Sequence, residues 1–216
     1  MGKETGVVYG VGVSDVTPVG YYNEDGKWRS YPWYIHWNGM LRRVYGDKAY
    51  LNRSPSYKYV TICAEWLLAS NFKLWYDEYN VLMPKELGVV QLDKDLLVLG
   101  CKEYSPVTSR LVPRKLNNIF INTNNKVGEL PVGVHYAPNH ANGVRRLKPY
   151  TTQVQLGAVG KRTCTRWETV SEAEADYNRL KLLQVKTRVA ECTDYVCPDL
   201  LVVLLKRGEE LYGNTR

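Results

Sequence analysis

The segment 132–190 constrains the fold most, because strand-like stretches are followed there by one helix with a clear start. Turn residues rich in Gly, Asn and Pro separate the stretches. The three stretches are Val132–Tyr136, Tyr150–Leu156 and Thr163–Trp167. Thr169 and Glu172 have the spacing of a capping box, which predicts a helix over about 172–190. The expected unit is a small three-stranded sheet packed on this helix.

The same segment carries most of the net charge. The 216 residues include 29 Lys and Arg and 22 Asp and Glu, a net charge of +7. Between Pro131 and Trp167 there is no Asp or Glu. The basic residues of that stretch are Arg145, Arg146, Lys148, Lys161, Arg162 and Arg166. A localised basic segment is typical of a surface that binds a polyanion, and the alternative is a solvated face without a partner.

A second stretch, 91–106, places two carboxylates and a Lys side by side at Asp93, Lys94 and Asp95. The predicted local structure is a strand that begins at Leu92 and continues through Leu96–Leu99, a turn at Gly100, a returning strand at 110–112 and a helix over 114–121. That helix carries Asn117 and Asn118. Two strands and a helix can hold a metal ion between carboxylate and amide oxygens. The alternative is a strand end closed by salt bridges.

The remaining elements are expected to build the first half of the chain and its end. His36 is interpreted as a packed helical His, because no second metal ligand lies near it. The expected elements are an extended arm over 1–32 with a short strand at 6–13, a helix from Pro32 to about Tyr45, a basic loop over 46–59, a strand over 60–63, a helix over 64–79, a linker over 84–88 and a helix over 198–212. The last helix is expected to dock on a domain or on a second chain, which would make a homodimer.

The composition excludes several classes of protein. The 5 Cys contain no Cys-x-x-Cys pair and only 3 His occur, so no structural zinc is expected. Free thiols in a reducing cytosol are expected instead. The longest apolar run, Leu200–Leu205, is too short to span a bilayer, and no signal segment is visible. We therefore expect a soluble protein that does not bind membranes.

Most of residues 33–121 resembles bacteriophage HNH-type homing endonucleases, because several motifs agree in order and spacing. The motifs are Trp37-x-x-Met40-Leu41-x-Arg43-x-Tyr45, Pro55-x-Tyr57, Cys63-x-Glu65-Trp66-Leu67, Asn71-Phe72-x-x-Trp75, Leu92-Asp93-Lys94-Asp95-Leu96-Leu97-Val98, Lys102-x-Tyr104-Ser105-Pro106-x-Thr108 and Val112-Pro113-x-x-Leu116-Asn117-Asn118. The second half resembles the DNA-binding domain of plant ethylene-response factors (the APETALA type). The matching residues are Pro131-Val132-Gly133-Val134, the strand at Tyr150–Val154 and Trp167-x-Thr169-x-x-Glu172-Ala173-x-x-x-Tyr177.

The resemblance implies an α+β protein with a ββα-metal (His-Me finger) domain followed by the three-stranded sheet on its helix. The finger normally has Asp-His at its first strand, whereas this chain has Lys94 after Asp93. Thr108 stands where Asn is expected after Ser-Pro. The implied boundaries are 1–32 for the arm, 33–125 for the finger domain, 126–192 for the DNA-binding domain and 193–216 for the C-terminal helix.

The implied activity is site-specific hydrolysis of double-stranded DNA with Mg²⁺ or another divalent cation, in the cytoplasm of an infected bacterial host. Lys94 is expected to stabilise charge, because a Lys beside carboxylates keeps its proton. Asp93 would bind the metal with Asp95 or with Asn117 and Asn118, and a metal-bound hydroxide or Tyr104 would activate water.

The strands of the second half would lie in the major groove, where Arg pairs with guanine, Gln with adenine and Lys mostly with phosphate. Alternation along the strand would put Gln153 and Gln155 on one face. The expected contacts are Arg145, Arg146, Lys148, Gln153, Gln155, Lys161, Arg162 and Arg166. Two alternatives are a catalytically degenerate finger that binds DNA as a regulator, and a phage protein that inhibits a host enzyme through its aromatic-rich first half.

Overall fold

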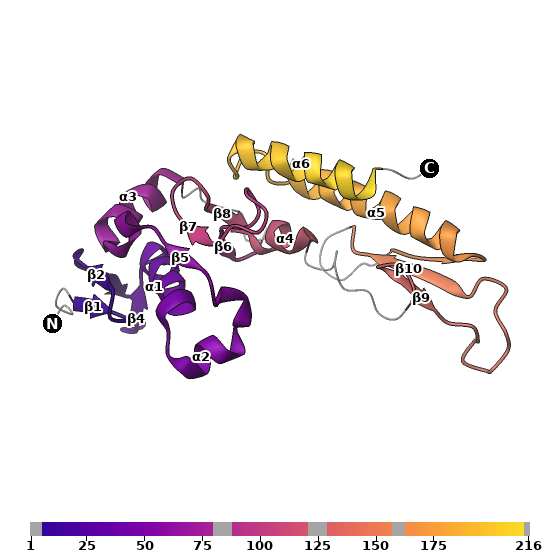
Figure 1. Ribbon diagram of the computed structural model, residues 1–216, viewed down its shortest axis with the longest axis horizontal. Coiled ribbons are helices and arrows are strands. Elements are labelled where there is room, and N and C mark those ends of the chain that lie inside the picture. Colours follow the sequence, from indigo (N-terminus) through magenta and orange to yellow (C-terminus); the bar gives the residue numbers. More distant parts are fainter. Residues whose placement is uncertain (1–5, 80–87, 121–128, 157–162, 214–216) are drawn as a thin grey trace. The chain divides into compact units, whose positions relative to one another are not determined.

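The structure is a computed structural model that describes residues 6–79, 88–120, 129–156 and 163–213 (Figure 1). It is a mixed α and β protein with small sheets, as the sequence predicts. The chain forms two compact units. The first unit is Met1–Met83 with Val89–Val112, and the second is Pro84–Gly88 with Pro113–Arg216. This division falls between Val112 and Pro113, whereas the boundary expected at 125/126 lies outside the described residues.

Two antiparallel hairpins form the described part of the N-terminal segment, where the sequence predicts an extended arm. β1 (Gly6–Val8) pairs with β2 (Gly12–Ser14), and β3 (Gly20–Tyr22) pairs with β4 (Trp28–Ser30). Asp15, which follows β2, accepts hydrogen bonds from the backbone nitrogen of Ser70 at 2.8 Å and from its hydroxyl at 2.5 Å. The segment is therefore a folded part of the first unit rather than an arm.

The helix predicted from Pro32 to Tyr45 is confirmed as α1 (Pro32–Tyr45). Proline suits its first turn because the backbone nitrogens there have no partner within the helix. α1 packs against α3 (Ala69–Tyr79), and both helices bury aromatic side chains. The buried residues of these two helices are Trp33, Trp37, Met40, Leu41, Ala69, Phe72, Trp75 and Tyr76. The aromatic side chains of both helices are therefore part of the core of the first unit.

Two predictions for the first half are wrong in detail. The helix predicted over 64–79 is interrupted, because the chain forms a 3-10 turn, η2 (Ala64–Leu67), and is extended at Leu68 before α3 begins. The loop predicted over 46–59 contains α2 (Lys48–Arg53) and η1 (Pro55–Tyr57). The Asp47 side chain caps α2 by accepting a hydrogen bond from the backbone nitrogen of Tyr50 at 2.8 Å.

Two short strand pairs follow. β5 (Thr61–Ile62) pairs in parallel with β7 (Glu103–Tyr104), and β6 (Val90–Asp93) pairs with β8 (Arg110–Pro113). The predicted returning strand is confirmed in β8. The prediction that Leu96–Leu99 continues the first strand is wrong, because β6 ends at Asp93 and turns occupy 94–100.

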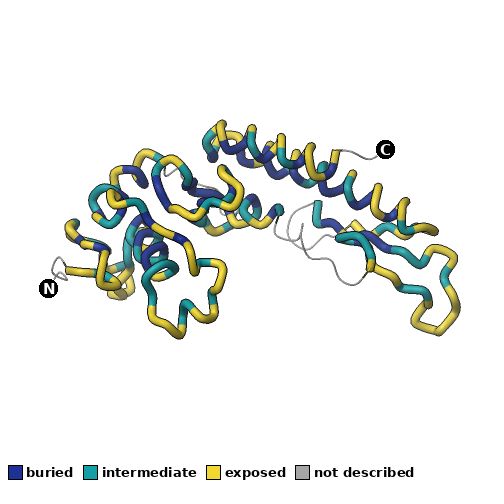
Figure 2. The backbone as a smooth tube through the Cα atoms, viewed as in Figure 1, coloured by how far each residue is buried: buried dark blue, intermediate teal, exposed yellow. Residues whose placement is uncertain are grey.

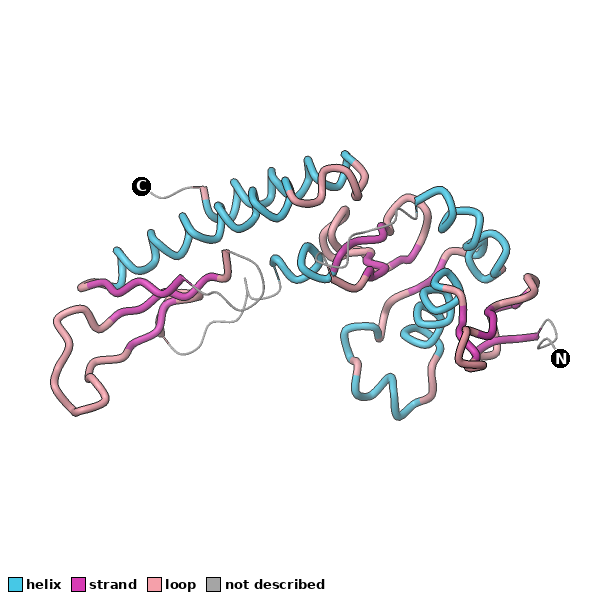
Figure 3. The backbone as a smooth tube through the Cα atoms, turned by 180° about the vertical axis from the view of Figure 1, so that it is seen from behind, coloured by secondary structure: helices cyan, strands magenta, loops and turns pink. Residues whose placement is uncertain are grey.

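The second unit begins with α4 (Arg114–Asn117) and η4 (Asn118–Phe120), where one helix is predicted. Its sheet consists of β9 (Val134–Tyr136), β10 (Tyr150–Val154) and β11 (Thr163–Trp167), antiparallel with β10 in the centre. α5 (Val170–Ala190) lies on one face of this sheet (Figures 1 and 3). The predicted capping box is present: the Thr169 hydroxyl accepts from the Glu172 nitrogen, and the Glu172 carboxylate accepts from the Thr169 nitrogen. The predicted sheet-on-helix unit is confirmed.

The C-terminal helix, α6 (Pro198–Tyr212), runs antiparallel beside α5 in the same unit (Figure 3). Gly208 permits this contact, since a Cβ at this position would lie 2.9 Å from Cγ1 of Val185. α6 therefore docks on its own chain. In the described part of the chain, no helix combines the length and the apolar character that a membrane span needs.

Candidate functional site

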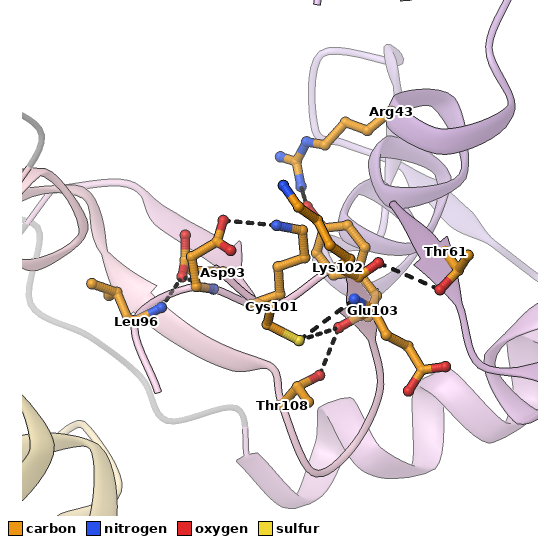
Figure 4. Close-up of polar contacts among 11 residues, drawn as sticks. Arg43, Thr61, Asp93, Leu96, Cys101, Lys102, Glu103 and Thr108 are labelled. Carbon is orange, nitrogen blue, oxygen red and sulfur yellow. Dashed lines mark hydrogen bonds and ion pairs between the residues drawn. The ribbon is translucent and has the colours of Figure 1, made fainter. Parts of the chain in front are cut away.

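Asp93 closes the turn that follows β6. Its Oδ1 accepts hydrogen bonds from the backbone nitrogens of Asp95 and Leu96, both at 2.7 Å (Figure 4). Asp and Asn commonly form turns in this way, with the side chain bonded to backbone two or three residues further on. Burial raises the pKa of the Asp93 carboxyl, and the two backbone donors offset part of that effect. Asp93 therefore has a structural role in this turn.

Lys94 points inward, although it lies in a charged turn. The residue is only 4% exposed, its Nζ lies 2.7 Å from Oδ2 of Asp95, and it sits over the ring of Tyr104 at 5.7 Å from the centroid. The ammonium is therefore paired with a carboxylate and an aromatic face at once. This is the salt-bridged arrangement that the sequence left open as an alternative to a metal site.

Tyr104 is poorly suited to act as a base. Its buried hydroxyl accepts a hydrogen bond from Nη1 of Arg43 at 3.3 Å. Burial raises the pKa of the Tyr104 phenol well above its usual value, although the Arg43 cation lowers it in part. The phenol thus stays protonated at neutral pH, and the contact joins α1 to β7.

The predicted metal ligands are divided between the two units. Asp93 and Asp95 belong to the first unit, and Asn117 and Asn118 to the second. Asp93 is the last residue of β6, whereas Asp95 lies in the turn that follows it. Among the described residues, no three His, Cys, Asp or Glu side chains gather as a metal site. Mg²⁺ can also bind through one or two carboxylates completed by water and substrate phosphate, and Asp93 with Asp95 offers that minimal set.

The sheet of the second unit has one covered and one open face. Thr152 points toward α5, because its hydroxyl donates to Oδ2 of Asp176 at 2.9 Å. Its strand neighbours Thr151 and Gln153 therefore point to the opposite face. Residues that are paired across neighbouring strands point to the same face of the sheet, so the strand partners of Thr151 and Gln153 also lie on the open face. The exposed side chains placed there are His135, Gln153, Cys164 and Arg166.

The loop between β9 and β10 carries three of the predicted DNA contacts. Arg145 and Lys148 are exposed, and most of this loop is exposed in Figure 2. Arg146 is half-buried and holds the loop together, since its Nε donates to the carbonyl of Asn139 at 2.7 Å. A bridge between Asn139 and Arg145 fixes the same loop. The loop thus presents cations from an ordered backbone.

The remaining predicted contacts are placed differently. Gln155 follows the end of β10 and is half-buried, and its carbonyl accepts a hydrogen bond from Nε2 of Gln184 at 2.7 Å. Lys161 and Arg162 lie outside the described residues. The sequence-based interpretation missed His135, which joins the open face only through its pairing with Thr151. The strand register would have been the signal, and it cannot be read from one strand alone.

In comparisons with known proteins, no family model, curated protein or solved structure matched this chain. Two surfaces of the described residues are therefore the candidates for function. They are the turn at 93–96 in the first unit, and the open sheet face with the loop at 137–149 in the second.

Proposed function

We propose that the chain binds double-stranded DNA through the open face of β9, β10 and β11 together with the loop at 137–149. The observation that carries this proposal is an exposed sheet face beside an exposed basic loop, within a segment free of Asp and Glu. A three-stranded sheet supported by one helix is also what the resemblance to ethylene-response DNA-binding domains implies.

The chemistry of the face suits duplex DNA. Strands fit the major groove, where Arg166 has the donor pattern for guanine and Gln153 that for adenine. Arg145 and Lys148 lie on the loop beside the sheet and would contact phosphates, which position a protein without reading sequence. Because phosphate contacts release counterions, binding should weaken steeply as salt rises.

The test compares two double variants of equal charge. Arg145→Gln with Arg166→Gln removes two cations from the proposed interface, whereas Lys186→Gln with Lys206→Gln removes two from the helices α5 and α6. Fluorescence anisotropy with labelled duplex DNA measures affinity over a range of salt. We expect the interface variant to bind roughly tenfold or more weakly with a salt slope reduced by about 1 to 2. Equal affinities of the two variants would contradict the proposal.

A second candidate function is divalent-metal-dependent, homing-type cleavage of DNA by a ββα-metal finger in an infected bacterial host. This proposal is supported by the paired strands β6 and β8, which are followed in the chain by α4, with the short strand β7 between the two strands. Asp93 with Asp95 would hold Mg²⁺. When bound, this ion would polarise the scissile phosphate and lower the pKa of its water. Lys94 would stabilise negative charge.

Asp93→Asn is the variant that best separates a metal-binding role of Asp93 from its structural role in the turn. Its amide oxygen can still accept both backbone hydrogen bonds of the turn, whereas the negative charge for a metal is lost. We expect wild type to nick phage DNA with Mg²⁺, and Asp93→Asn to lose nicking at unchanged thermal stability. Asp77→Ala, which removes an exposed carboxylate of α3, is the control.

Three outcomes would redirect this proposal. Nicking that persists in Asp93→Asn would remove Asp93 from the site. DNA binding without nicking under any divalent metal would favour a degenerate finger that acts as a regulator. Capture of a host enzyme in the absence of nucleic acid would favour the inhibitor, whose contact surface would be the exposed aromatic side chains of the first unit, Tyr21, Tyr22 and Trp28 among them.

A further inference from the structure

The second unit contains a basic cavity of about 610 Å³ that the DNA interface does not use as a whole. It lies between α4, the end of β10 and α5. Its wall contains the cations Arg114, Lys115, Lys181 and Arg188. No Asp or Glu occurs among the described residues that line it. A concave surface with cations and no carboxylate in its wall concentrates positive potential.

Lys181 is a buried polar side chain of this wall, at 8% exposed, and it bonds across elements. Its Nζ donates to the carbonyl of Ile119 and to Oε1 of Gln184, both at 2.8 Å. Gln184 in turn donates to the carbonyl of Gln155. This chain of hydrogen bonds joins η4, α5 and the end of β10. These hydrogen bonds fix the shape of the cavity. Their acceptors are carbonyl and amide oxygens, so among the described residues no ion pair neutralises the positive charge of Lys181.

The other cations come from two different elements. Arg114 and Lys115 project from α4, and Arg188 from the last turns of α5. Arg188 is nearly buried and forms an ion pair with Glu191 at 2.6 Å, an arrangement that holds the guanidinium in place.

We propose that this cavity binds a phosphate-bearing ligand of nucleotide size. Its volume falls in the range of small-molecule sites and exceeds what a lone phosphate needs. Arg and Lys are the usual phosphate ligands, and the amides of Gln153 and Asn118 in the same wall match the hydrogen-bonding edges of a base. This inference goes beyond the DNA interface, and binding of a free nucleotide in the cavity does not depend on that interface.

Two sources share this chemistry. One is a free mononucleotide. The other is the backbone of a DNA strand that continues from the sheet, because Gln153 lies both on the open face and in the cavity wall. β9 pairs with residues 150–152 of β10 only, so the later part of β10 extends past that strand toward the cavity. The experiment must therefore separate a nucleotide from a DNA strand.

The test uses the full chain and two probes, deoxyadenosine monophosphate and duplex DNA, with inorganic phosphate as competitor. Arg114→Gln with Lys115→Gln removes two cations from the cavity, and Lys186→Gln with Lys206→Gln is the control pair outside it. If the cavity binds the free nucleotide, calorimetry will detect binding to wild type and to the control. The cavity variant will bind about tenfold or more weakly, the loss expected for a charge-assisted contact.

If the ligand is a DNA strand, the mononucleotide will not bind, and the cavity variant alone will lose about tenfold in affinity for duplex DNA. The proposal is overturned if wild type binds no mononucleotide and the cavity variant binds duplex DNA as tightly as the control pair Lys186→Gln with Lys206→Gln. That result leaves the sheet interface intact, whereas loss of DNA binding only in Arg145→Gln with Arg166→Gln supports the interface and not the cavity. Arg114→Gln alone, at an exposed position, replaces the double variant if the latter lowers the thermal midpoint.

Discussion

At the scale of single residues, Asp176 joins the sheet of the second unit to α5. Its Oδ2 accepts hydrogen bonds from the Thr152 hydroxyl at 2.9 Å and from Nε1 of Trp167 at 3.2 Å. Its Oδ1 lies 2.7 Å from Nη2 of Arg179. Burial raises the pKa of this carboxyl, but the three donors outweigh burial and the pKa is lowered. The ionised carboxylate is therefore the form that stabilises the unit.

We expect Asp176→Ala to lower the free energy of unfolding by roughly 2 to 4 kcal/mol, because Thr152 and Trp167 lose their acceptor in a buried place. Asp176→Asn should cost less, since its amide oxygen can still accept one or both hydrogen bonds. Urea denaturation at neutral pH measures both variants. Asp194→Ala, at an exposed position, is the control. A loss in Asp176→Ala no larger than that of the control would contradict this account.

His36 gives the first unit a pH dependence. The imidazole stacks on the ring of Tyr76, with the centroids 5.7 Å apart, and burial together with the Arg43 cation lowers its pKa to about 4. In the unfolded chain the pKa is about 6.5. Between these values the unfolded state binds a proton that the folded state does not, so the free energy of unfolding falls as pH falls through this window.

We therefore expect His36→Gln to flatten the acid side of the stability profile. The wild type should lose on the order of 1 kcal/mol more than the variant between about pH 7 and pH 5. Chemical denaturation at several pH values measures the difference between the two proteins, and carboxylates that titrate in both cancel from it. Parallel profiles for the two proteins would show that His36 is not neutral in the folded state.

At the scale of elements, Gly133 allows β9 to approach α5. Its φ is +80°, and a Cβ there would lie 2.0 Å from Cε2 of Tyr177. Gly143 offers a matched control, because its φ is +81° but nothing lies within 4 Å of its Cβ position. We expect Gly143→Ala to cost about 1 kcal/mol from backbone strain alone. Gly133→Ala should cost several-fold more, because the clash also displaces Tyr177. Thermal unfolding of the two variants tests this, and equal midpoints would contradict it.

Local patterns were enough to predict the elements whose signals lie in adjacent residues. Pro32 starts α1 and the Thr169–Glu172 box starts α5, and both helices begin where the sequence indicates. The break at Leu68 was not predictable in this way, because apolar periodicity continues through it. The turn after β6 was missed since Leu96–Leu99 reads as apolar strand, whereas the Asp93 side chain bonds backbone nitrogens and bends the chain.

The candidate site, too, could be predicted only in part from patterns in neighbouring residues. Arg166 and Gln153 were predicted as contacts from their residue types, and they lie on the open face. His135 could not be assigned to that face, because its position depends on the register between β9 and β10. The inward direction of Lys94 depends on Tyr104, which lies ten positions further along the chain. The positions of these side chains depend on contacts between elements, which the spacing of residues within one element does not show.

At the scale of the whole molecule, the charge is divided unequally between the two units. Residues 113–216 hold sixteen Lys and Arg and ten Asp and Glu, a net charge of +6, and residues 1–112 hold a net charge of +1. The second unit also has a core of its own, made where β9 and β10 meet α5 and where α5 meets α6. Its buried apolar residues include Val134, Val154, Leu180, Val185, Leu200 and Leu204.

We therefore expect the fragment 113–216 to fold alone and to bind duplex DNA with nearly the salt dependence of the full chain, because counterion release depends on the phosphate contacts made. Fragment 1–112 should bind at least about tenfold more weakly, since its charges nearly cancel. Circular dichroism checks that both fragments fold, and anisotropy titrations at several salt concentrations compare their affinities. If the first fragment carried most of the affinity, the interface would lie in the unit of the Asp93 turn, and the sheet face would be only a solvated basic surface.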